Sequence, residues 1–121
     1  MRLPDPDFWR GRRVLVTGST GFKGSWLALL LRHLGAEVTG FALAPDSDLS
    51  HFHLAGVASQ IDQHTGDVRD LAQVQTVVDR CEPEVVFHLA AQALVFAGFA
   101  DPVGTYGTNV MGTVHLLESL R

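Results

Sequence analysis

The sequence predicts an α/β domain built on a parallel, doubly wound sheet that is incomplete, with about four strands. Short apolar runs alternate with stretches of helical periodicity, in the order β-α-β-loop-β-α-β-α. Such alternation predicts parallel strands joined by right-handed crossovers. The run at residues 85–89 does not alternate between apolar and polar positions, which indicates a strand covered on both faces. With 121 residues the chain has room for one domain, and we expect the strand order 3-2-1-4.

Composition excludes several classes of protein. Apolar residues make up 46% and charged residues 18%, which is globular rather than disordered composition. The net charge of -4 gives no basic surface for nucleic acid or anionic membrane. The longest apolar run, residues 26–31, is far too short to span a membrane, and the N-terminus has no apolar signal core. The single cysteine, Cys81, excludes an internal disulfide, so we expect a cytoplasmic protein.

The first half of the chain divides into an arm and two strands around one helix. Residues 1–12 form an expected N-terminal arm that docks through Phe8 and Trp9. A buried strand at 14–16 leads into a glycine-rich turn at 18–24. A helix follows, with one apolar face and Gly35 as its C′ residue; the face consists of Leu27, Leu30, Leu31 and Leu34. The second strand covers residues 37–43, and residues 44–59 are expected to be a loop.

The second half repeats the alternation. A weak strand at 61–65 precedes a helix capped by Asp70, with Gln73 at the capping-box position and Leu71, Val74 and Val78 as its stripe. Pro83 ends that helix, and a strand at 85–89 and a loop at 90–100 come next. Asp101 and Pro102 are the N-cap and first residue of a long helix. Its apolar side consists of Val103, Tyr106, Val110, Val114 and Leu117.

The glycine-rich turn carries the chemistry. Gly18, Gly21 and Gly24 fall three apart between a buried strand and an amphipathic helix. A tight turn without side chains lets a diphosphate reach bare backbone N–H groups, and the helix N-terminus adds partial positive charge. A plain strand-to-helix turn is the other interpretation of this segment. A Walker-type loop is excluded because Lys23 is followed by Gly24 rather than Ser or Thr.

This turn resembles the Thr-Gly-x-x-Gly-x-x-Gly fingerprint of the short-chain dehydrogenase/reductase family, in its extended branch that acts on nucleotide sugars. Residues 66–70, 88–92, 108–114 and 116–118 resemble further segments of that branch. The resemblance implies a Rossmann-type fold in which residues 13–121 are the N-terminal portion of an NAD(P)-binding domain. It implies NAD as the cofactor, with NADP not excluded, and cofactor contacts from Gly18, Thr20, Gly21, Phe22, Lys23, Asp67, Val68, Leu89, Ala90, Ala91, Gln92 and Asn109.

Finer features, at Phe8-Trp9 and residues 21–26, 40–43 and 109–113, resemble the CDP-glucose 4,6-dehydratases. In those enzymes NAD takes a hydride from sugar C4 and returns it to C6 after water is lost, giving a 4-keto-6-deoxy sugar nucleotide. The resemblance therefore implies a nucleotide-sugar substrate and a homodimer. A related nucleotide-sugar epimerase, or a truncated or degenerate fragment that binds a dinucleotide without turnover, remain alternatives.

The chain also departs from the family. The catalytic Tyr-x-x-x-Lys pair is absent, because the only tyrosine, Tyr106, is followed four residues on by Val110, and the only lysine is Lys23. No substrate domain follows within these residues, so we expect no turnover from this chain alone. Ala44 stands where the family often has an aspartate near the adenine ribose. Residues 93–99 are apolar where the family has an arginine and hydroxyl groups.

Other conspicuous side chains have plainer interpretations. His51 and His53 could suggest a metal pair, but a solvated surface pair is favoured, since no third ligand is near. His88 is interpreted as a hydrogen-bonded core histidine and Cys81 as an ordinary thiol.

Four other residues could likewise have either a structural or a ligand-binding role. Asp67 is either a turn residue or a cofactor contact, and the second is favoured. Asn109 is equally compatible with a structural and a cofactor-lining role. Trp9 and Trp26 are interpreted as packing residues.

Overall fold

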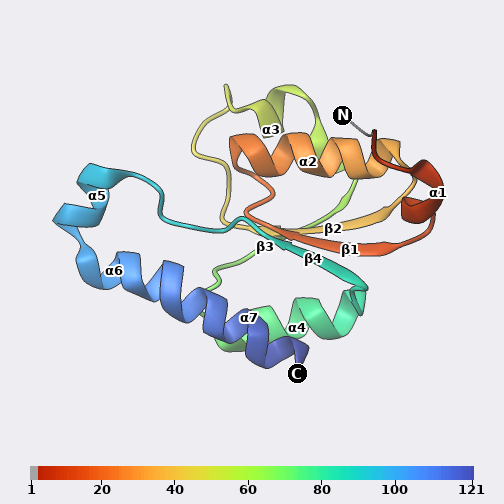
Figure 1. Ribbon diagram of the computed structural model, residues 1–121. Coiled ribbons are helices and arrows are strands. Elements are labelled where there is room, and N and C mark those ends of the chain that lie inside the picture. Colours follow the sequence, from red (N-terminus) through yellow and green to blue (C-terminus); the bar gives the residue numbers. More distant parts are fainter. Residues whose placement is uncertain (1–2) are drawn as a thin grey trace.

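The computed structural model describes residues 3–121 and shows a four-stranded sheet with helices on both faces (Figure 1). The strands are β1 (Arg13–Thr17), β2 (Glu37–Ala42), β3 (Asp62–Thr65) and β4 (Val85–His88). Their order is β3-β2-β1-β4, and every neighbouring pair is parallel. The predicted Rossmann-type order 3-2-1-4 is confirmed, and each strand boundary lies within about two residues of the expected one.

Two helical layers enclose the sheet (Figure 1). One contains α2 (Phe22–His33), α3 (His51–Leu54) and the short 3₁₀ helix η1 (Val57–Ser59). The other contains α4 (Leu71–Cys81) and a long helix made of α6 (Pro102–Tyr106), the π-helical turn η2 (Gly107–Met111) and α7 (Gly112–Leu120). The short helices α1 (Pro6–Trp9) and α5 (Val95–Ala100) lie at opposite ends of the molecule.

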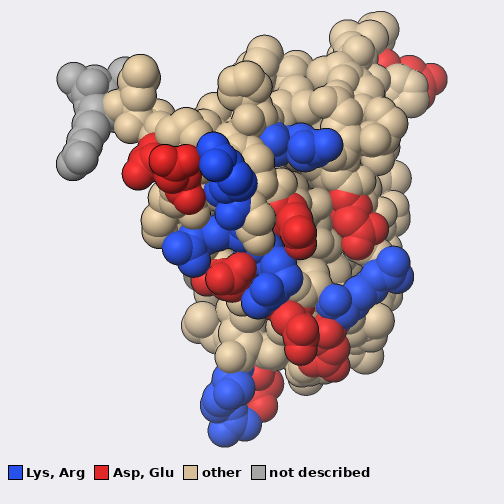
Figure 2. Space-filling model, turned by 90° about the vertical axis from the view of Figure 1, so that its right-hand side faces the viewer, with Lys and Arg blue, Asp and Glu red and all other residues tan. Residues whose placement is uncertain are grey.

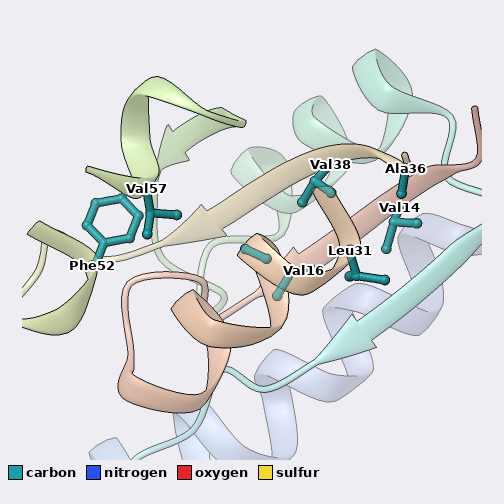
Figure 3. Close-up of a cluster of buried hydrophobic side chains, with 8 residues drawn as sticks. Val14, Val16, Leu31, Ala36, Val38, Phe52 and Val57 are labelled. Atoms are coloured by element: carbon teal, nitrogen blue, oxygen red, sulfur yellow. The ribbon is translucent and has the colours of Figure 1, made fainter. Parts of the chain in front are cut away.

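Strand β1 joins the two cores because successive side chains of a strand point to opposite faces. Val14 and Val16 pack with Leu31, Val38 and Phe52 in the core beneath α2 (Figure 3). Leu15 belongs to the second core, which also contains Phe41, Val68, Val74, Val77, Val78 and Leu116. A strand that serves two cores must be apolar at every position, which is the pattern of residues 14–16.

The predicted caps are present. The Asp70 carboxylate accepts hydrogen bonds from Ala72 N and Gln73 N, at 3.0 and 3.2 Å. Gln73 does not close the expected capping box, because its Oε1 accepts instead from Asp67 N at 3.0 Å. Asp101 Oδ1 accepts from Gly104 N at 2.9 Å. Gly35, with φ +90°, ends α2 as its C′ residue.

The expected loops contain short helices that the sequence analysis missed. Within residues 44–59, Ser50 caps α3, and Phe52 and Val57 are buried. Within residues 90–100, α5 has neither a buried residue nor a side-chain cap, so neither hydrophobic periodicity nor a capping residue marks it. The arm forms α1, and Trp9 docks against Phe87 with ring centroids 6.0 Å apart. The first two residues of the arm lie outside the described residues.

Three predicted helix faces need correction. The buried side of α2 consists of Gly24, Ser25, Ala28 and Leu31, whereas Leu30 is 46% exposed. On α4, Val77 is buried in place of Leu71. The expected apolar side of the long helix faces outward, and its buried positions are Gly112, Leu116 and Ser119. Small residues let a helix approach the sheet closely, so the buried side of α2 and of the long helix is not the side with the most large apolar residues.

The end of the sheet where the strands begin is charged but mixed in sign (Figure 2). Glu84, just before β4, lies 3.4 Å from Arg12 Nη1 and accepts a hydrogen bond from Arg13 N at 3.0 Å. Arg10 pairs with Asp7 at 3.0 Å. Such interspersed pairs form no basic patch of one sign. Across residues 3–121 no helix has the length and apolarity that crossing a membrane requires.

Candidate functional site

A cleft of about 540 Å³ opens at the carboxyl ends of the strands. In the order 3-2-1-4 the chain leaves β1 toward β2 on one side and meets β4 on the other, and ligands of doubly wound sheets bind at such a reversal. The walls are the glycine turn, the segment after β2, the turn before α4, the segment after β4 and the start of the long helix. Five segments distant in sequence thus meet at one point.

The three glycines of the turn are required for different reasons. Gly18 has φ +70°, and a Cβ there would lie 2.7 Å from the backbone of Leu89 and Ala90. A Cβ on Gly24 would overlap Gly18 O, so this glycine lets α2 pack against the turn. Gly21 has φ -71°, and a Cβ there would meet only Gly18 O, at 3.3 Å. The backbone conformation does not demand glycine at 21, and a Cβ there would make one tight contact rather than the clashes found at 18 and 24; its absent side chain leaves the cleft open in front of α2.

The first turn of α2 offers unfilled hydrogen-bonding capacity to this open space. Gly21 is the N-cap of α2 and supplies no side-chain acceptor to the first N–H groups. Those groups and the helix dipole favour an anion in front of the turn. The shape and chemistry of the turn therefore fit a diphosphate.

Most of the residues expected at a cofactor line the cleft: Gly18, Thr20, Gly21, Asp67, Val68, Leu89, Ala90, Ala91 and Gln92. Phe22 and Lys23 do not line it, since they begin α2 and Phe22 is 72% exposed. Phe22 and Lys23 contribute their backbone N–H groups to the turn. Asn109 does not line it either.

Asn109 instead holds the floor of the cleft in place. Its Oδ1 accepts from Gln92 N at 2.8 Å, and its Nδ2 donates to Gln92 O at 3.0 Å. The Gln92 side chain then bonds Leu94 N and Leu94 O, at 2.6 and 3.0 Å. Asn109 lies in the π-helical turn, a local irregularity that occurs frequently at functional sites. Its geometry favours the structural interpretation of this residue.

His88 ties three elements together beside the cleft. Its Nδ1 lies 2.6 Å from Thr17 Oγ1, and its Nε2 lies 3.2 Å from Thr113 Oγ1. Thr113 Oγ1 already donates to Asn109 O at 2.9 Å, so we assign the proton to His88 Nε2. Thr17 then donates to Nδ1 while accepting from Leu89 N and Ala90 N. Burial lowers the pKa of His88, which is a hydrogen-bonded, half-buried histidine.

Asp67 and Arg69 form an ion pair at the wall of the cleft. Arg69 donates from Nε at 2.9 Å and from Nη2 at 2.6 Å to Asp67 Oδ2, and Arg69 N donates to Oδ1. The hydrogen bonds from the Arg69 side chain lower the pKa of Asp67. Asp67 is thus a turn residue by its hydrogen bonds and also a lining residue of the cleft.

The sequence analysis missed several lining residues. Arg69, Thr105 and Thr108 reach the cleft from the turn before α4 and from the long helix. Residues 43–46 line it as well, because Thr20 Oγ1 donates to Leu43 O at 2.9 Å and holds this segment beside the turn. Asp46 is the carboxylate that this segment contributes. The sequence signal for Asp46 was its position two residues after Ala44, which stands where the family often has an aspartate.

The remaining candidates have structural environments. His51 is not solvated as expected: Trp26 stacks on it with ring centroids 4.1 Å apart, and its Nδ1 lies 2.7 Å from Ser25 Oγ. Residues 3–121 contain no group of three or more His, Cys, Asp or Glu side chains able to hold a metal. Burial raises the pKa of Cys81, which keeps it protonated and unreactive.

Residues 15–121 match the family model described as GDP-mannose 4,6 dehydratase. The chain belongs to this family. It is 48% identical to CDP-glucose 4,6-dehydratase from Salmonella typhimurium, over 97% of this chain and 33% of that protein. It is 36% identical to UDP-glucose 4-epimerase from Mycolicibacterium smegmatis, over 90% of this chain and 34% of that protein. The chain thus spans about a third of the length of these curated relatives.

Solved structures of the extended short-chain dehydrogenase/reductase type share this fold, as the resemblance implied. UDP-glucose 4-epimerase from Thermus thermophilus, solved in complex with NAD, matches with a TM-score of 0.76 and 34% identity, over 88% of this chain and 33% of that one. The Brucella ovis enzyme, also solved with NAD, matches with a TM-score of 0.74 and 32% identity, over 90% and 32%. In both solved structures the matched part makes up about a third of the chain.

Proposed function

We propose that this chain is the dinucleotide-binding part of a nucleotide-sugar 4,6-dehydratase, with NAD as its cofactor. Residues 13–121 would be the N-terminal portion of the binding domain, with residues 1–12 as an arm. The glycine turn would hold the diphosphate, and Asp67 and Val68 would face the adenine. Residues 89–92 would lie along the rest of the dinucleotide. Bound NAD would supply hydride acceptance and return, and these residues would bind and orient it.

The observation that carries this proposal is the open space at Gly21. Of the three glycines, it is the one with neither a left-handed φ nor a Cβ clash below 3 Å, since a Cβ there would meet only Gly18 O, at 3.3 Å. Its Cα faces a cleft at the reversal of strand order, at a helix N-terminus without a side-chain cap. A diphosphate requires these three conditions together.

A CDP-glucose-like substrate is the finer part of the proposal. It is supported by the 48% identity to the Salmonella enzyme, against 31–36% for the other relatives compared, GDP-mannose dehydratases and an epimerase. A homodimer is proposed as well, because the outer side of the long helix leaves Val103, Val110, Val114 and Leu117 exposed.

A nucleotide-sugar epimerase is the second candidate, favoured by the NAD-bound epimerase structures that share this fold. The two functions give different products from the full-length protein. A dehydratase converts CDP-glucose to a 4-keto-6-deoxy sugar nucleotide, whereas an epimerase returns a sugar of unchanged mass with one inverted centre. Mass spectrometry of the product distinguishes them.

Substitutions at Gly21 test the binding site. In the full-length protein, Gly21→Ala adds one Cβ toward the cleft and Gly21→Val adds two further methyl groups where the diphosphate must approach. We expect NAD affinity by calorimetric titration to fall in that order, with Gly21→Val weaker by at least roughly tenfold, or about 1.4 kcal/mol. Ala58→Val, at an exposed position of η1 that does not line the cleft, is the matched control and should bind as wild type. Unchanged affinity in a folded Gly21→Val protein would refute the site.

A further inference from the structure

The segment after β2 brings one unpaired carboxylate to the cleft. Gly18 N donates to Phe41 O at 2.9 Å and Thr20 Oγ1 to Leu43 O at 2.9 Å, so this segment and the glycine turn are held side by side. Ala44, the position about 20 residues past the turn where a ribose-binding carboxylate is usual, has no polar side chain. Asp46 follows two positions later and lines the same cleft.

The other charged groups of the cleft already have partners. Asp67 and Arg69 bind each other through several hydrogen bonds, and Asp101 caps the long helix through Gly104 N. Asp46 makes no hydrogen bond or ion pair with any of residues 3–121. Pro45 fixes its own φ immediately before Asp46 and so restricts where this carboxylate can lie. Asp46 is therefore the acceptor that remains available to a bound molecule.

The balance of charge in the cleft determines which dinucleotide it suits. Three carboxylates and one guanidinium line it, and the guanidinium is engaged by Asp67. A phosphate monoester carries roughly -1.5 to -2 charges at neutral pH. A 2′-phosphate on the adenosine ribose would therefore meet uncompensated negative charge, whereas free ribose hydroxyls would meet an acceptor.

We propose that Asp46 accepts hydrogen bonds from the adenosine ribose hydroxyls and so makes the cleft select NAD over NADP. This inference rests on the proposed function, since it requires a dinucleotide at the glycine turn. Asp46 would thus take the role of the carboxylate that is usual at the position of Ala44, two residues earlier in the chain. Arg69 does not offset it, because that side chain is held by Asp67.

The test measures the affinities of NAD and NADP, without any turnover, by calorimetric titration of the full-length protein. We expect wild type to prefer NAD by about tenfold or more, and Asp46→Asn to reduce that preference by about tenfold or more. Asp48→Asn is the matched control: it removes the same charge from the same loop, at a residue that does not line the cleft. It should leave the ratio of the two affinities within about twofold of wild type, since a distant charge acts weakly through solvent.

The outcomes separate this inference from the proposed function. If Asp46→Asn had the wild-type ratio of NAD to NADP affinity, or if Asp48→Asn changed that ratio equally, the role of Asp46 would be overturned. NAD binding by wild type would still support the proposed dinucleotide site. A wild-type preference for NADP would overturn it too. Failure of wild type to bind either dinucleotide would instead contradict the proposed function. Circular dichroism of each variant checks that the exposed substitutions leave the fold unchanged.

Discussion

His88 bonds at both ring nitrogens, to Thr17 on β1 and to Thr113 on the long helix. Neutral imidazole satisfies this arrangement, because Nδ1 accepts from Thr17 while Nε2 donates to Thr113. A proton on Nδ1 would turn that nitrogen into a donor facing a hydroxyl that already accepts from Leu89 N and Ala90 N. Protonation would therefore cost the hydrogen bond between Thr17 on β1 and His88 on β4.

Stability should consequently fall in mild acid. Burial lowers the pKa of His88 below its ordinary 6.5, so the unfolded chain binds a proton at a higher pH than the folded chain does. The free energy of unfolding is then retained above about 6.5 and declines as the pH falls toward the lowered value. We predict that urea denaturation from about pH 8 to about pH 5 shows a weaker pH dependence in His88→Gln than in wild type.

The control for this experiment is another histidine. His53 is exposed and its side chain makes no hydrogen bond within residues 3–121, so His53→Gln should keep the pH dependence of wild type. We also expect His88→Gln to cost about 1 kcal/mol at neutral pH, through imperfect hydrogen bonds. Equal pH dependence in wild type and His88→Gln would contradict the role assigned to this histidine.

Sequence spacing predicts the glycine turn but not the reason for each glycine. Gly18, Gly21 and Gly24 look equivalent in the motif, yet one needs a left-handed φ, one keeps space free and one permits close packing. At Gly18 the restriction comes from residues 89 and 90, which lie far along the chain, whereas Gly21 and Gly24 meet the backbone of the turn itself. Likewise, Asp46 and Arg69 reach the cleft through tertiary placement, which no local pattern encodes.

Among the elements, the π-helical turn η2 has the clearest link to the site. It places Asn109 so that its amide pairs with both the N–H and the C=O of Gln92. Residues 89–94 follow β4 without regular structure, so side-chain hydrogen bonds must fix their path. Asn109 acts on the cleft by positioning this segment.

We predict that Asn109→Ala destabilises the protein by about 1–2 kcal/mol, because two hydrogen bonds are lost at a partly solvated site. Asn109→Asp keeps an acceptor for Gln92 N but sets an oxygen against Gln92 O, so it should retain part of the stability at most. NAD affinity should weaken in both variants, measured by titration below their unfolding transitions. If Asn109→Ala kept both wild-type stability and wild-type NAD affinity, the hydrogen bonds of Asn109 to Gln92 would have no effect on residues 89–94.

Hydrophobic periodicity predicted the long elements and misjudged some of their faces. Leu27, Leu30, Leu31 and Leu34 repeat at helical spacing, yet the side of α2 against the sheet is built from Gly24, Ser25, Ala28 and Leu31. Close approach of helix and sheet selects small residues, and counting large ones cannot detect it. The caps Asp70 and Asp101 were predictable because their hydrogen bonds are local.

For the molecule as a whole, the alternation of strands and helices predicted the parallel sheet, and the Rossmann-type doubly wound pattern predicted its strand order and the place of the cleft. The outer surface was harder to anticipate. The apolar side of the long helix faces outward, and α5 adds Phe96 and Phe99, of which Phe96 is 88% exposed. An exposed apolar surface of this extent is typical of a region that contacts another protein surface.

From the distribution of reactive groups over the molecule we predict that these 121 residues alone do not convert CDP-glucose. Hydride removal from C4 requires a base at the C4 hydroxyl, and the resemblance to the short-chain dehydrogenase/reductase family implies a tyrosine aided by a lysine. Tyr106 is 68% exposed, does not line the cleft and is followed one helical turn on by Val110. Lys23, the lysine of this chain, lies in the first turn of α2 and not one helical turn after Tyr106.

The measurement is incubation of the purified 121-residue chain with CDP-glucose and NAD, followed by the absorbance of the 4-keto product in alkali. The Salmonella CDP-glucose 4,6-dehydratase serves as the positive control under the same conditions. We expect no product above the enzyme-free background, even where titration detects NAD binding, because binding needs the glycine turn while turnover needs a base that the cleft does not hold. Product from this chain would mean that another side chain at the cleft, such as Asp46 or Asp101, removes the proton.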